Sequence, residues 1–457
     1  MQEKDESQVT SDASNARSVS RRKVLQYGLA GGGLILGAGL LAACGANGSP
    51  SSANSTANGS SFGKAAKGKV VLRFPSWQWG QPGYDEFFSA ALAAFTEQHP
   101  NVTFQKIPIE SASYASEMVK MYVANDPPEI NQFLSQLYYQ AASAGWYETL
   151  DSPLKGTDIE TSWSPFLDKA AVFDGNRYGI WISGSSQALM YNKKMFAEAN
   201  LQPPTTSEEL LTSAKTLTKD AAGGKQYGYS ITTKMDVNGY IYGLSSFIAG
   251  FGGSWVKSGK LDVSHPANTA AIEFERDLVK AGATPLGLDR IAARQAFYEG
   301  KAAMMIEGPW VMTSAAKENP GIVAYLGVVK LPFKNQVAGT SNGFAMAKNQ
   351  KYSYEAWQFI KMIMSKPWQE KYGEMTGVAP GRSNSLTPKA LQSAPWLTTF
   401  AEAQDKGKSY ITPGFETQEN QIGTIIAQEV NDVFFGNDTA VQALARIADD
   451  FKKIKVS

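Results

Sequence analysis

The chain alternates two patterns of apolar and polar residues from Val70 onward. Short apolar runs bounded by turn residues are typical of buried strands, whereas apolar positions that recur every three or four residues are typical of helices. Because the two patterns follow one another through the rest of the chain, the sequence predicts an α/β protein. We find no internal repeat that would suggest a solenoid or a propeller.

The predicted elements begin and end near prolines, glycines and capping residues. We expect strands at Val70–Phe74, Val102–Ile109, Glu129–Phe133, Tyr178–Ile182 and Ala188–Tyr191. We expect helices at Tyr84–Gln98, Tyr114–Val123, 206–219, Asn268–Lys280, Tyr354–Met364, Glu419–Phe435 and Thr439–Lys453. The helix over 206–219 should start with a capping box, because Thr206 is followed three residues later by Glu209.

Residues 1–43 have the pattern of an export signal rather than of a fold. Arg21 and Arg22 precede a glycine-rich apolar run, which resembles a twin-arginine signal. Val24 and Gln26 depart from the residues usual in that motif, so ordinary Sec export remains the alternative.

The apolar run ends in Leu-Ala-Ala-Cys44, which resembles a bacterial lipobox. Cys44 is the only cysteine of the chain and would carry the lipid after cleavage. The alternative is a membrane-spanning anchor with an unrelated cysteine, but the run is short and rich in glycine for a stable span. Residues 44–69 are rich in Gly, Ser and Asn, and we expect them to form a flexible tether after the lipidated cysteine.

Composition excludes several classes of protein. The chain has 43 Lys and Arg against 42 Asp and Glu, so it lacks the basic excess of a nucleic-acid binder. One cysteine excludes a disulfide framework and a cysteine-rich zinc site, and two histidines argue against a metal centre built on histidine. We therefore expect no metal and no cofactor, and we identify no motif of catalytic residues.

Several segments together resemble the extracellular solute-binding proteins of carbohydrate ABC importers, the family that includes maltose-binding protein. Near the start the similar segments are Phe-Pro-Ser-Trp over 74–77 and Phe-Thr-Glu-Gln-His-Pro-Asn-Val over 95–102. Further on they are 189–201 with 203–210, Phe-Tyr-Glu-Gly-Lys-Ala-Ala-Met-Met-Ile-Glu-Gly-Pro-Trp over 297–310, 341–347 with 355–361, and Gly-Val-Ala-Pro-Gly-Arg over 377–382. Two positions depart from the family pattern, namely the stretch Pro-Glu-Ile-Asn-Gln over 128–132 and Trp181.

The resemblance implies an α/β periplasmic-binding-protein fold of type II, with two lobes, crossover hinge strands and a ligand cleft between the lobes. It places lobe 1 at 70–183 plus 335–382, and lobe 2 at 184–334 plus 383–457. It also implies a monomer that is not an enzyme. Such a protein, lipid-anchored on the outer face of the cytoplasmic membrane or in the periplasm, would capture a sugar or oligosaccharide and deliver it to the membrane subunits of an ABC permease.

A sugar presents a weakly apolar face of C–H groups and an edge of hydroxyls, so its site needs flat aromatic rings and planar polar groups. The candidate stacking residues lie at element ends beside glycine or turn residues, and are Trp77, Trp255 and Trp310. The candidate polar residues are Gln132, Ser185, Ser186, Asp236, Asn342 and Arg382. Trp146, Trp163 and Trp357 lie within apolar helical patterns, and we expect them in the core.

Each candidate residue also has a structural alternative. The three tryptophans could belong to the core, Asp236 could be a solvated turn residue, and Arg382 could form a salt bridge across its lobe. For the function, the same fold could bind a polyol, a polyamine or a glycerol phosphate. A secreted glycoside hydrolase is the enzymatic alternative, because it needs only two carboxylates at a suitable separation.

Overall fold

The computed structural model describes residues 62–454, except 112, 222–223 and 413. The chain divides into two units, Met1–Asn58 and Gly59–Ser457, and all described residues lie in the second. The predicted export signal, Cys44 and the tether up to residue 61 therefore lie outside the described residues. Among the helices that are described, none has the length and apolar character that a membrane crossing requires.

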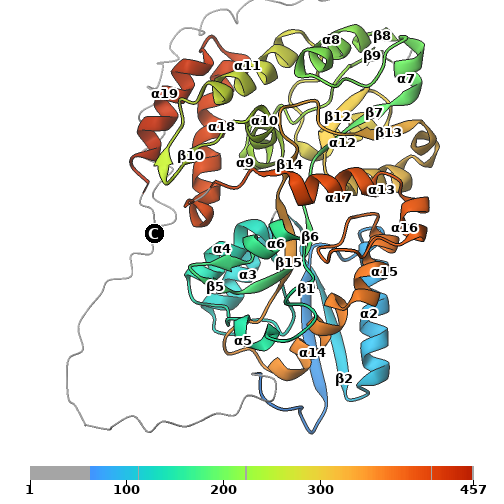
Figure 1. Cartoon of the computed structure of the whole chain (residues 1–457), viewed down its shortest axis with the longest axis vertical. Helices are drawn as coiled ribbons and strands as arrows, with labels where there is room; N and C mark the ends of the chain where they lie inside the picture. Colours follow the sequence, from blue (N-terminus) through green and yellow to red (C-terminus); the bar gives the residue numbers. More distant parts are fainter. Residues whose placement is uncertain (1–61, 112, 222–223, 413, 455–457) are drawn as a thin grey trace, which may run out of the picture. The chain divides into compact units, whose positions relative to one another are not determined.

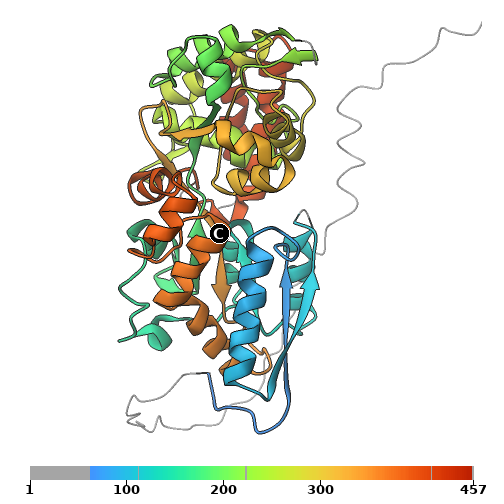
Figure 2. The same ribbon diagram turned by 90° about the vertical axis from the view of Figure 1, so that its right-hand side faces the viewer.

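A first group of strands forms one two-stranded and one three-stranded sheet. Strands β1 (Val70–Ser76) and β2 (Val102–Pro108) are parallel, and helix α2 (Tyr84–Gln98) connects them and lies beside them (Figure 2). Strand β15 (Thr340–Ala345) pairs antiparallel with both β3 (Asn131–Leu134) and β6 (Gly179–Gly184). The amide of Ile130 donates to the carbonyl of Arg73, so the chain entering β3 runs beside β1.

Helices and short hairpin strands surround this first group (Figure 1). They are α3 (Tyr114–Val123), α4 (Ser135–Ser143), α5 (Asp151–Leu154), α6 (Pro165–Ala170), β4 (Val172–Phe173), β5 (Asn176–Arg177), α14 (Ser353–Met364), α15 (Lys366–Thr376), α16 (Pro388–Ser393) and α17 (Leu397–Lys406). The apolar residues of most of these helices pack against the strands in one core, whereas those of α16 and α17 lie in two smaller clusters.

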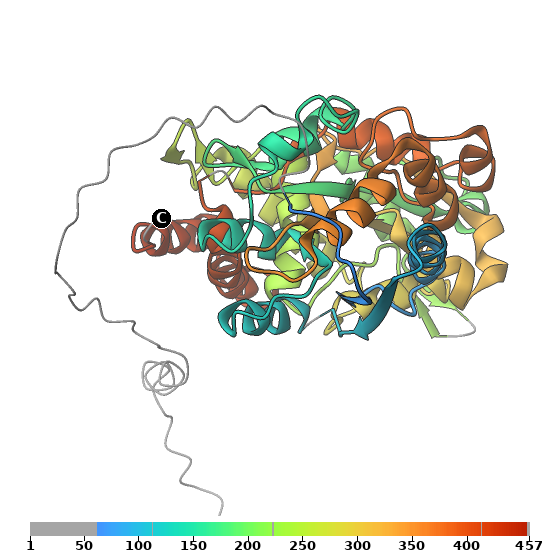
Figure 3. The same cartoon turned by 90° about the horizontal axis from the view of Figure 1, so that it is seen from below.

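A second group of elements is centred on strand β7 (Ala188–Asn192), which pairs antiparallel with β12 (Met304–Glu307) and β13 (Leu326–Val329). The short strands of this group are β8 (Lys219–Ala221), β9 (Gly224–Gln226), β10 (Val256–Lys257) and β11 (Lys260–Leu261). Its helices are α7 (Lys193–Glu198), α8 (Ser207–Leu217), α9 (Val237–Gly239), the π-turn η1 (Tyr240–Leu244), α10 (Ser245–Phe251), α11 (Pro266–Lys280), α12 (Arg290–Tyr298), α13 (Trp310–Glu318), η2 (Pro320–Tyr325), η3 (Glu416–Gln418), α18 (Glu419–Phe435) and α19 (Ala440–Phe451). Helices α18 and α19 pack side by side (Figure 3).

The chain passes between the two groups through segments that are hydrogen-bonded to each other. Between β6 and β7, the amide of Ser185 donates to the carbonyl of Gly339 (2.7 Å) and the amide of Gln187 donates to the carbonyl of Val337 (3.1 Å). Strand β14 (Val337–Ala338) also pairs in parallel with β16 (Lys408–Ser409). The expected lobe boundaries at 183/184 and 334/335 lie next to these crossing segments and remain our proposal.

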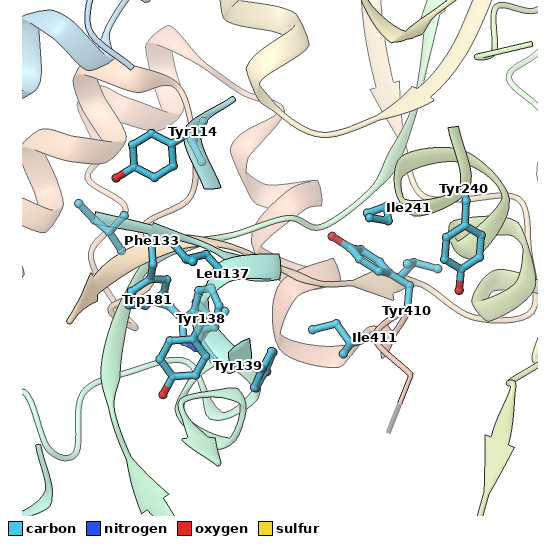
Figure 4. Close-up of a cluster of buried hydrophobic side chains, with 14 of the residues drawn as sticks. Tyr114, Phe133, Leu137, Tyr138, Tyr139, Trp181, Tyr240, Ile241, Tyr410 and Ile411 are labelled. Carbon is cyan, nitrogen blue, oxygen red and sulfur yellow. The ribbon is translucent and has the colours of Figure 1, made fainter. Parts of the chain in front are cut away.

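Aromatic side chains fill the core beneath β3 and β6 (Figure 4). The ring of Trp181, fully buried, lies 4.8 Å from that of Phe133 and 5.0 Å from that of Tyr138. Trp181, one of the positions where the sequence departs from the family pattern, is therefore a packing residue of the core. Trp163 and Trp357 are buried as predicted, and Trp146 is partly buried and stacks on Tyr122.

Several sequence predictions need correction. The third strand starts at Asn131 rather than Glu129, because the Glu129 carboxylate accepts hydrogen bonds from the backbone and side chain of Arg73. The Thr206 hydroxyl caps α8 as predicted, but the Glu209 carboxylate bonds to Thr205 rather than completing the box at Thr206. Helices α10, α12, α13, α15 and α17 were not among the predicted elements.

The last part of the predicted tether contacts the folded part of the chain. The Phe62 ring lies 5.4 Å from the ring of Trp357, and the amide of Ala66 donates to the Glu355 carboxylate at 2.6 Å. Both partners are in α14, so residues 62–66 dock on this helix.

Candidate ligand-binding site

Three side-chain amides meet, one from the loop after β1, one from β3 and one from β15. Gln132 lies in β3, Asn342 in β15, and Gln78 two residues beyond β1. The Gln132 Nε2 group donates to Gln78 Oε1 at 2.6 Å and to Asn342 Oδ1 at 3.2 Å. All three side chains are buried. The structure thus brings together two predicted site residues, Gln132 and Asn342, and adds Gln78; we call the three the amide cluster.

Hydroxyl groups extend the amide cluster. Asn342 Nδ2 donates to Ser183 Oγ at 3.4 Å, and the hydroxyl of Tyr372 donates to the same oxygen at 3.2 Å. Burial raises the pKa of Tyr372 to about 12, so its hydroxyl stays protonated and able to donate. Within the described residues, the buried Gln132 Oε1 has no hydrogen-bond partner, and such an atom calls for a donor.

Trp77, the first predicted stacking residue, lies beside the amide cluster. Its ring packs edge-on against Tyr114 with 4.7 Å between centroids, and the Tyr114 hydroxyl donates to the backbone carbonyl of Gln132 at 2.6 Å. Trp77 is half-buried, whereas Tyr114 is fully buried. Tyr114 therefore supports Trp77 from within the core and leaves part of the indole ring accessible.

A second cluster forms at the end of β12. The Glu307 carboxylate accepts from Arg290 Nη2 at 2.8 Å and from Arg294 Nη2 at 2.6 Å. These arginines lie one turn apart on α12, a spacing that puts both on one face of the helix. Trp310, the first residue of α13, donates from its indole nitrogen to Glu307 at 2.6 Å. We call Arg290, Arg294, Glu307 and Trp310 the arginine clamp.

The arginine clamp holds a buried charge and fixes a ring. Burial alone would raise the pKa of Glu307, but the charges and hydrogen bonds of Arg290 and Arg294 outweigh it and lower that pKa. Both guanidinium groups lie near the Trp310 ring, at 5.4 Å and 5.8 Å from its centroid. A Cβ on Gly308 would lie 2.1 Å from this ring, so only glycine lets the indole fold back over the chain.

A small cavity of about 20 Å³ adjoins the arginine clamp. Arg290 and Glu307 line it together with Ser230, Thr232 and Gly243. Its size suits about one water molecule. Gly243 belongs to the π-turn η1, an irregularity that is frequent at functional sites.

Tyr84 packs edge-on against Tyr372, with 6.2 Å between the ring centroids. The pKa of Tyr84 is raised by burial and by its neighbour Tyr372, and the Arg294 charge acts on it in the opposite direction. Tyr372 is the residue that donates to Ser183 in the network of the amide cluster. Nearby, the Thr313 hydroxyl of α13 donates to the carbonyl of Thr376 in α15 at 2.7 Å. This hydrogen bond joins α13 of the second group of elements to α15 of the first.

Residues 90–399 match the family of bacterial extracellular solute-binding proteins. The chain belongs to this family. The galactooligosaccharide-binding protein of Bacillus subtilis is 24% identical over 435 residues, which cover 90% of this chain and 93% of that protein. The diacetylchitobiose binding protein DasA of Streptomyces coelicolor is 29% identical over 281 residues, which cover 59% of this chain and 62% of that protein.

The fold is that of the two-lobed periplasmic binding proteins. The structure of maltose-bound MalE3 from T. maritima superposes with a TM-score of 0.74 at 20% identity, covering 84% of this chain and 99% of that one. This likeness accounts for the two groups of strands and for the crossing segments between them. The predicted fold class and family are thereby confirmed.

The other predicted site residues of this solute-binding protein have partners within the fold. Ser185 and Ser186 are buried in the crossing segment; Ser185 accepts from the Tyr410 hydroxyl at 3.1 Å, and Ser186 donates to the carbonyl of Phe400 at 2.8 Å. Asp236 caps α9 by accepting from the amide of Gly239 at 2.8 Å. Ser185 and Ser186 therefore hold the crossing segment in place, and Asp236 caps the start of α9. None of the three belongs to the amide cluster or to the arginine clamp among the described interactions.

Arg382 and Trp255 are likewise engaged. Arg382 forms an ion pair with Asp158 at 2.8 Å and lies over the Trp163 ring, which is the salt-bridge alternative that the sequence left open. Trp255 is 3% exposed and packs against Tyr240 and Phe451 in the core. Neither side chain is in contact with the amide cluster or the arginine clamp among the described interactions.

Sequence reasoning overlooked Gln78, Arg290, Arg294 and Glu307. A usable signal existed for the last three, because Arg-x-x-x-Arg on a helix precedes a glutamate that directly follows the apolar run Ala-Ala-Met-Met-Ile. A carboxylate at the end of a buried strand needs a cationic partner, and two arginines one turn apart can supply it.

Proposed function

We propose that this solute-binding protein captures a sugar or oligosaccharide outside the cytoplasmic membrane and delivers it to an ABC permease. The observation that carries the proposal is the half-buried Trp77 beside the amide cluster. An indole face suits the C–H face of a sugar, and amides both donate to and accept from hydroxyls. The relatives named above, which bind a galactooligosaccharide and diacetylchitobiose, favour the same class of ligand.

In this proposal, Trp77, Gln132 and Asn342 contact the ligand from one lobe, and Trp310 contacts it from the other. The buried Gln132 Oε1 would accept a hydrogen bond from a sugar hydroxyl. Ser185 and Ser186 act at the hinge, where ligand binding in the cleft favours closure of the lobes. Recognition of the closed form by the permease membrane subunits would then release the ligand for transport.

The protein would act as a monomer held at the outer face of the membrane by a lipid on Cys44. A diacylglyceryl group with a further acyl chain anchors a protein stably, whereas one chain does so marginally. Mass spectrometry of the membrane-extracted protein tests this anchor. A mature chain that begins with acylated Cys44 supports the proposal, and a chain that retains residues 1–43 contradicts it.

The ligand class is tested by a thermal-shift screen of the full-length chain in detergent against neutral sugars, acidic sugars, polyols and polyamines. A ligand at 100 times its Kd stabilises the folded state by roughly 2.7 kcal/mol, which raises the melting temperature measurably. We expect a shift with one sugar class and no new reducing ends after long incubation. A response to polyamines alone would contradict the sugar proposal, and the release of reducing ends would indicate a hydrolase.

A further inference from the structure

A cavity of about 380 Å³ opens at one end of the three-stranded sheet of β7, β12 and β13. Asn192, the last residue of β7, lines this cavity, and so does Tyr325, which directly precedes β13. Ala188 and Glu307 pair at the opposite end of the sheet, which holds the arginine clamp. That end is roughly 13 Å away along β7, because a strand rises about 3.3 Å per residue. None of the residues that we assign to the proposed sugar site lines this cavity.

The cavity has the size of a ligand site and an aromatic wall. Ligand pockets in proteins have volumes of roughly 300–1,000 Å³, a range that includes this cavity. Tyr325 is 45% exposed, and the Lys194 ammonium group, also at the cavity, lies 5.7 Å from its ring centroid. An exposed tyrosine ring gives a ligand a flat apolar surface of the kind that suits the C–H face of a sugar.

Three amide side chains line the cavity, and the fold engages one end of each. Asn192 caps helix α7, because its Oδ1 atom accepts from the amides of Lys194 at 3.1 Å and Met195 at 3.2 Å. The described hydrogen bonds leave its Nδ2 group without an acceptor. Since the cap fixes the orientation of this side chain, the donor is held in place before a ligand arrives.

Asn319 and Gln226 have the complementary arrangement. Asn319 Nδ2 donates to the carbonyl of Tyr298 at 2.8 Å, and Gln226 Nε2 donates to the carbonyl of Leu217 at 2.7 Å. Among the described residues, neither Asn319 Oδ1 nor Gln226 Oε1 has a donor. The three amides thus offer one donor group and two acceptors, a set that suits hydroxyls because these both donate and accept.

The charged residues around the cavity are paired with each other. The Lys194 ammonium group lies 4.0 Å from the Glu198 carboxylate, and that of Lys301 lies 2.7 Å from the Glu299 carboxylate. Two positive charges match two negative charges, so no surplus charge selects an ionic ligand. Such exposed pairs stabilise a protein little, so their members can turn to a sugar hydroxyl at small cost.

We propose that this cavity is a second carbohydrate site, which takes a neutral sugar unit. Tyr325 stacks on the C–H face of the sugar, and the remaining amide atoms of Asn192, Gln226 and Asn319 bond to its hydroxyls. All lining residues belong to the second group of elements, so binding here does not require closure of the lobes. The site is additional to the one in the proposed function.

Methyl NMR on the full-length chain tests the proposal, because Met195 also lines the cavity and provides a local signal. The chain is labelled at its methionine methyl groups and kept in a detergent without a sugar head group, and Met195→Leu assigns the signal. The probes are glucose, galactose, N-acetylglucosamine and a trisaccharide of each, with spermidine and glycerol phosphate as charged controls. We expect one class of neutral sugar to shift the Met195 signal with a Kd on the order of 1 mM, as suits an open site.

Trp77→Ala separates this site from the proposed sugar site. Because Trp77 does not line the cavity, the Met195 shift should persist in this variant with an unchanged Kd. Loss of the shift would overturn the inference and leave the proposed function intact. If Met195 responded to sugars and calorimetry found no binding that depends on Trp77, the proposed function would fail and the inference would stand.

The probes provide further outcomes that would overturn the inference. One is a Met195 shift with spermidine or glycerol phosphate alone, because the ligand would then be an ion. The other is the absence of any shift with the sugars at about 50 mM, far above a millimolar Kd.

Substitutions of Tyr325 test the role of its flat ring. Tyr325→Leu keeps an apolar side chain but removes the ring, so it should weaken binding at the cavity by roughly tenfold. Tyr325→Phe is the matched control, because it keeps the ring and should stay within about threefold of wild type. Since Tyr325 is exposed, both variants should fold like the wild type. An equal Kd in the two variants would contradict stacking on this ring.

Discussion

The amide cluster and the arginine clamp differ in how their polar atoms are satisfied. In the amide cluster the groups are neutral, and the buried Gln132 Oε1 has no partner among the described residues. In the arginine clamp the Glu307 carboxylate is charged and accepts from both arginines and from the indole of Trp310. One cluster has an acceptor available to a ligand, whereas the other is a rigid, charged support.

This difference indicates a division of labour within the site. A neutral network is inexpensive to bury and can exchange partners when a sugar arrives. A buried ion pair loses much of its stabilisation once one member is removed, because an uncompensated charge remains. The amide cluster should therefore determine recognition of the sugar ring, and the arginine clamp should contribute stability.

The largest expected effect concerns the acid of the arginine clamp. Glu307→Leu would leave Arg290 and Arg294 without the carboxylate that they share, so it should lower the free energy of unfolding by about 3–5 kcal/mol. Urea denaturation measures this loss. Glu402→Leu is the control, because Glu402 pairs with Lys330 at the exposed surface and its loss should have little effect. Equal losses in the two variants would contradict the role of the clamp.

The second prediction compares Glu307 with Glu275, a carboxylate in the buried face of α11 without an arginine partner among its described interactions. Burial raises the pKa of Glu275 to about 8 from an ordinary value of 4.5. The folded state therefore holds this proton more tightly than the unfolded state does. The contribution of Glu275 to the free energy of unfolding is full below pH 4.5. It is lost at roughly 1.4 kcal/mol per pH unit as the pH rises from 4.5 through 8.

Glu275→Gln should remove this pH dependence, which urea denaturation at a series of pH values between 5 and 9 would show. Glu419 is also buried, and burial and Glu416 raise its pKa to about 8, so only the difference between wild type and variant isolates Glu275. Glu307→Gln should instead change how the free energy of unfolding depends on pH at acidic values. The pKa of Glu307 is lowered in the folded state, so its contribution to stability is lost as the pH falls. An unchanged alkaline limb in Glu275→Gln would contradict the prediction.

The third prediction separates recognition from packing within one loop. Trp77→Ala should weaken sugar binding by about 2 kcal/mol, or roughly 30-fold, and change stability little. Trp79→Ala is the control, because Trp79 donates to the carbonyl of Phe74 and packs against Phe74 and Phe88. It should lower stability more than binding. Calorimetry and urea denaturation of both variants test this, and the reverse ranking would contradict our assignment of Trp77.

Much of the fold could be predicted because it depends on local patterns. The helices at Tyr84–Gln98, Tyr114–Val123 and Glu419–Phe435 have the predicted bounds, since their apolar stripes and end signals are clear. Helices α10 and α13 were overlooked for a physical reason. The sequence over 240–251 is buried almost throughout and carries no polar face, and α13 follows Gly308 and Pro309 with little acidic or basic patterning.

The candidate site was less predictable because it depends on long-range contacts. Gln132 and Asn342 were found from the family resemblance, but the bond that joins them spans 210 residues. Arg382 and Trp255 have the same local signals as the residues that we propose for the site, namely glycine and turn neighbours, yet their partners are Asp158 and Phe451. Only the fold distinguishes an arginine in a clamp from an arginine in a salt bridge.

The smallest expected effect concerns Arg382, which forms a simpler ion pair than the arginines of the clamp. Its partner Asp158 is 67% exposed, so water competes for the carboxylate and the pair should contribute little. Asp158→Asn should change the free energy of unfolding by no more than about 1 kcal/mol and leave sugar affinity unchanged, because Arg382 also donates to the carbonyl of Met364 and lies over Trp163. Calorimetry with the best sugar measures the affinity. A clear gain or loss of affinity would place Arg382 at the ligand after all.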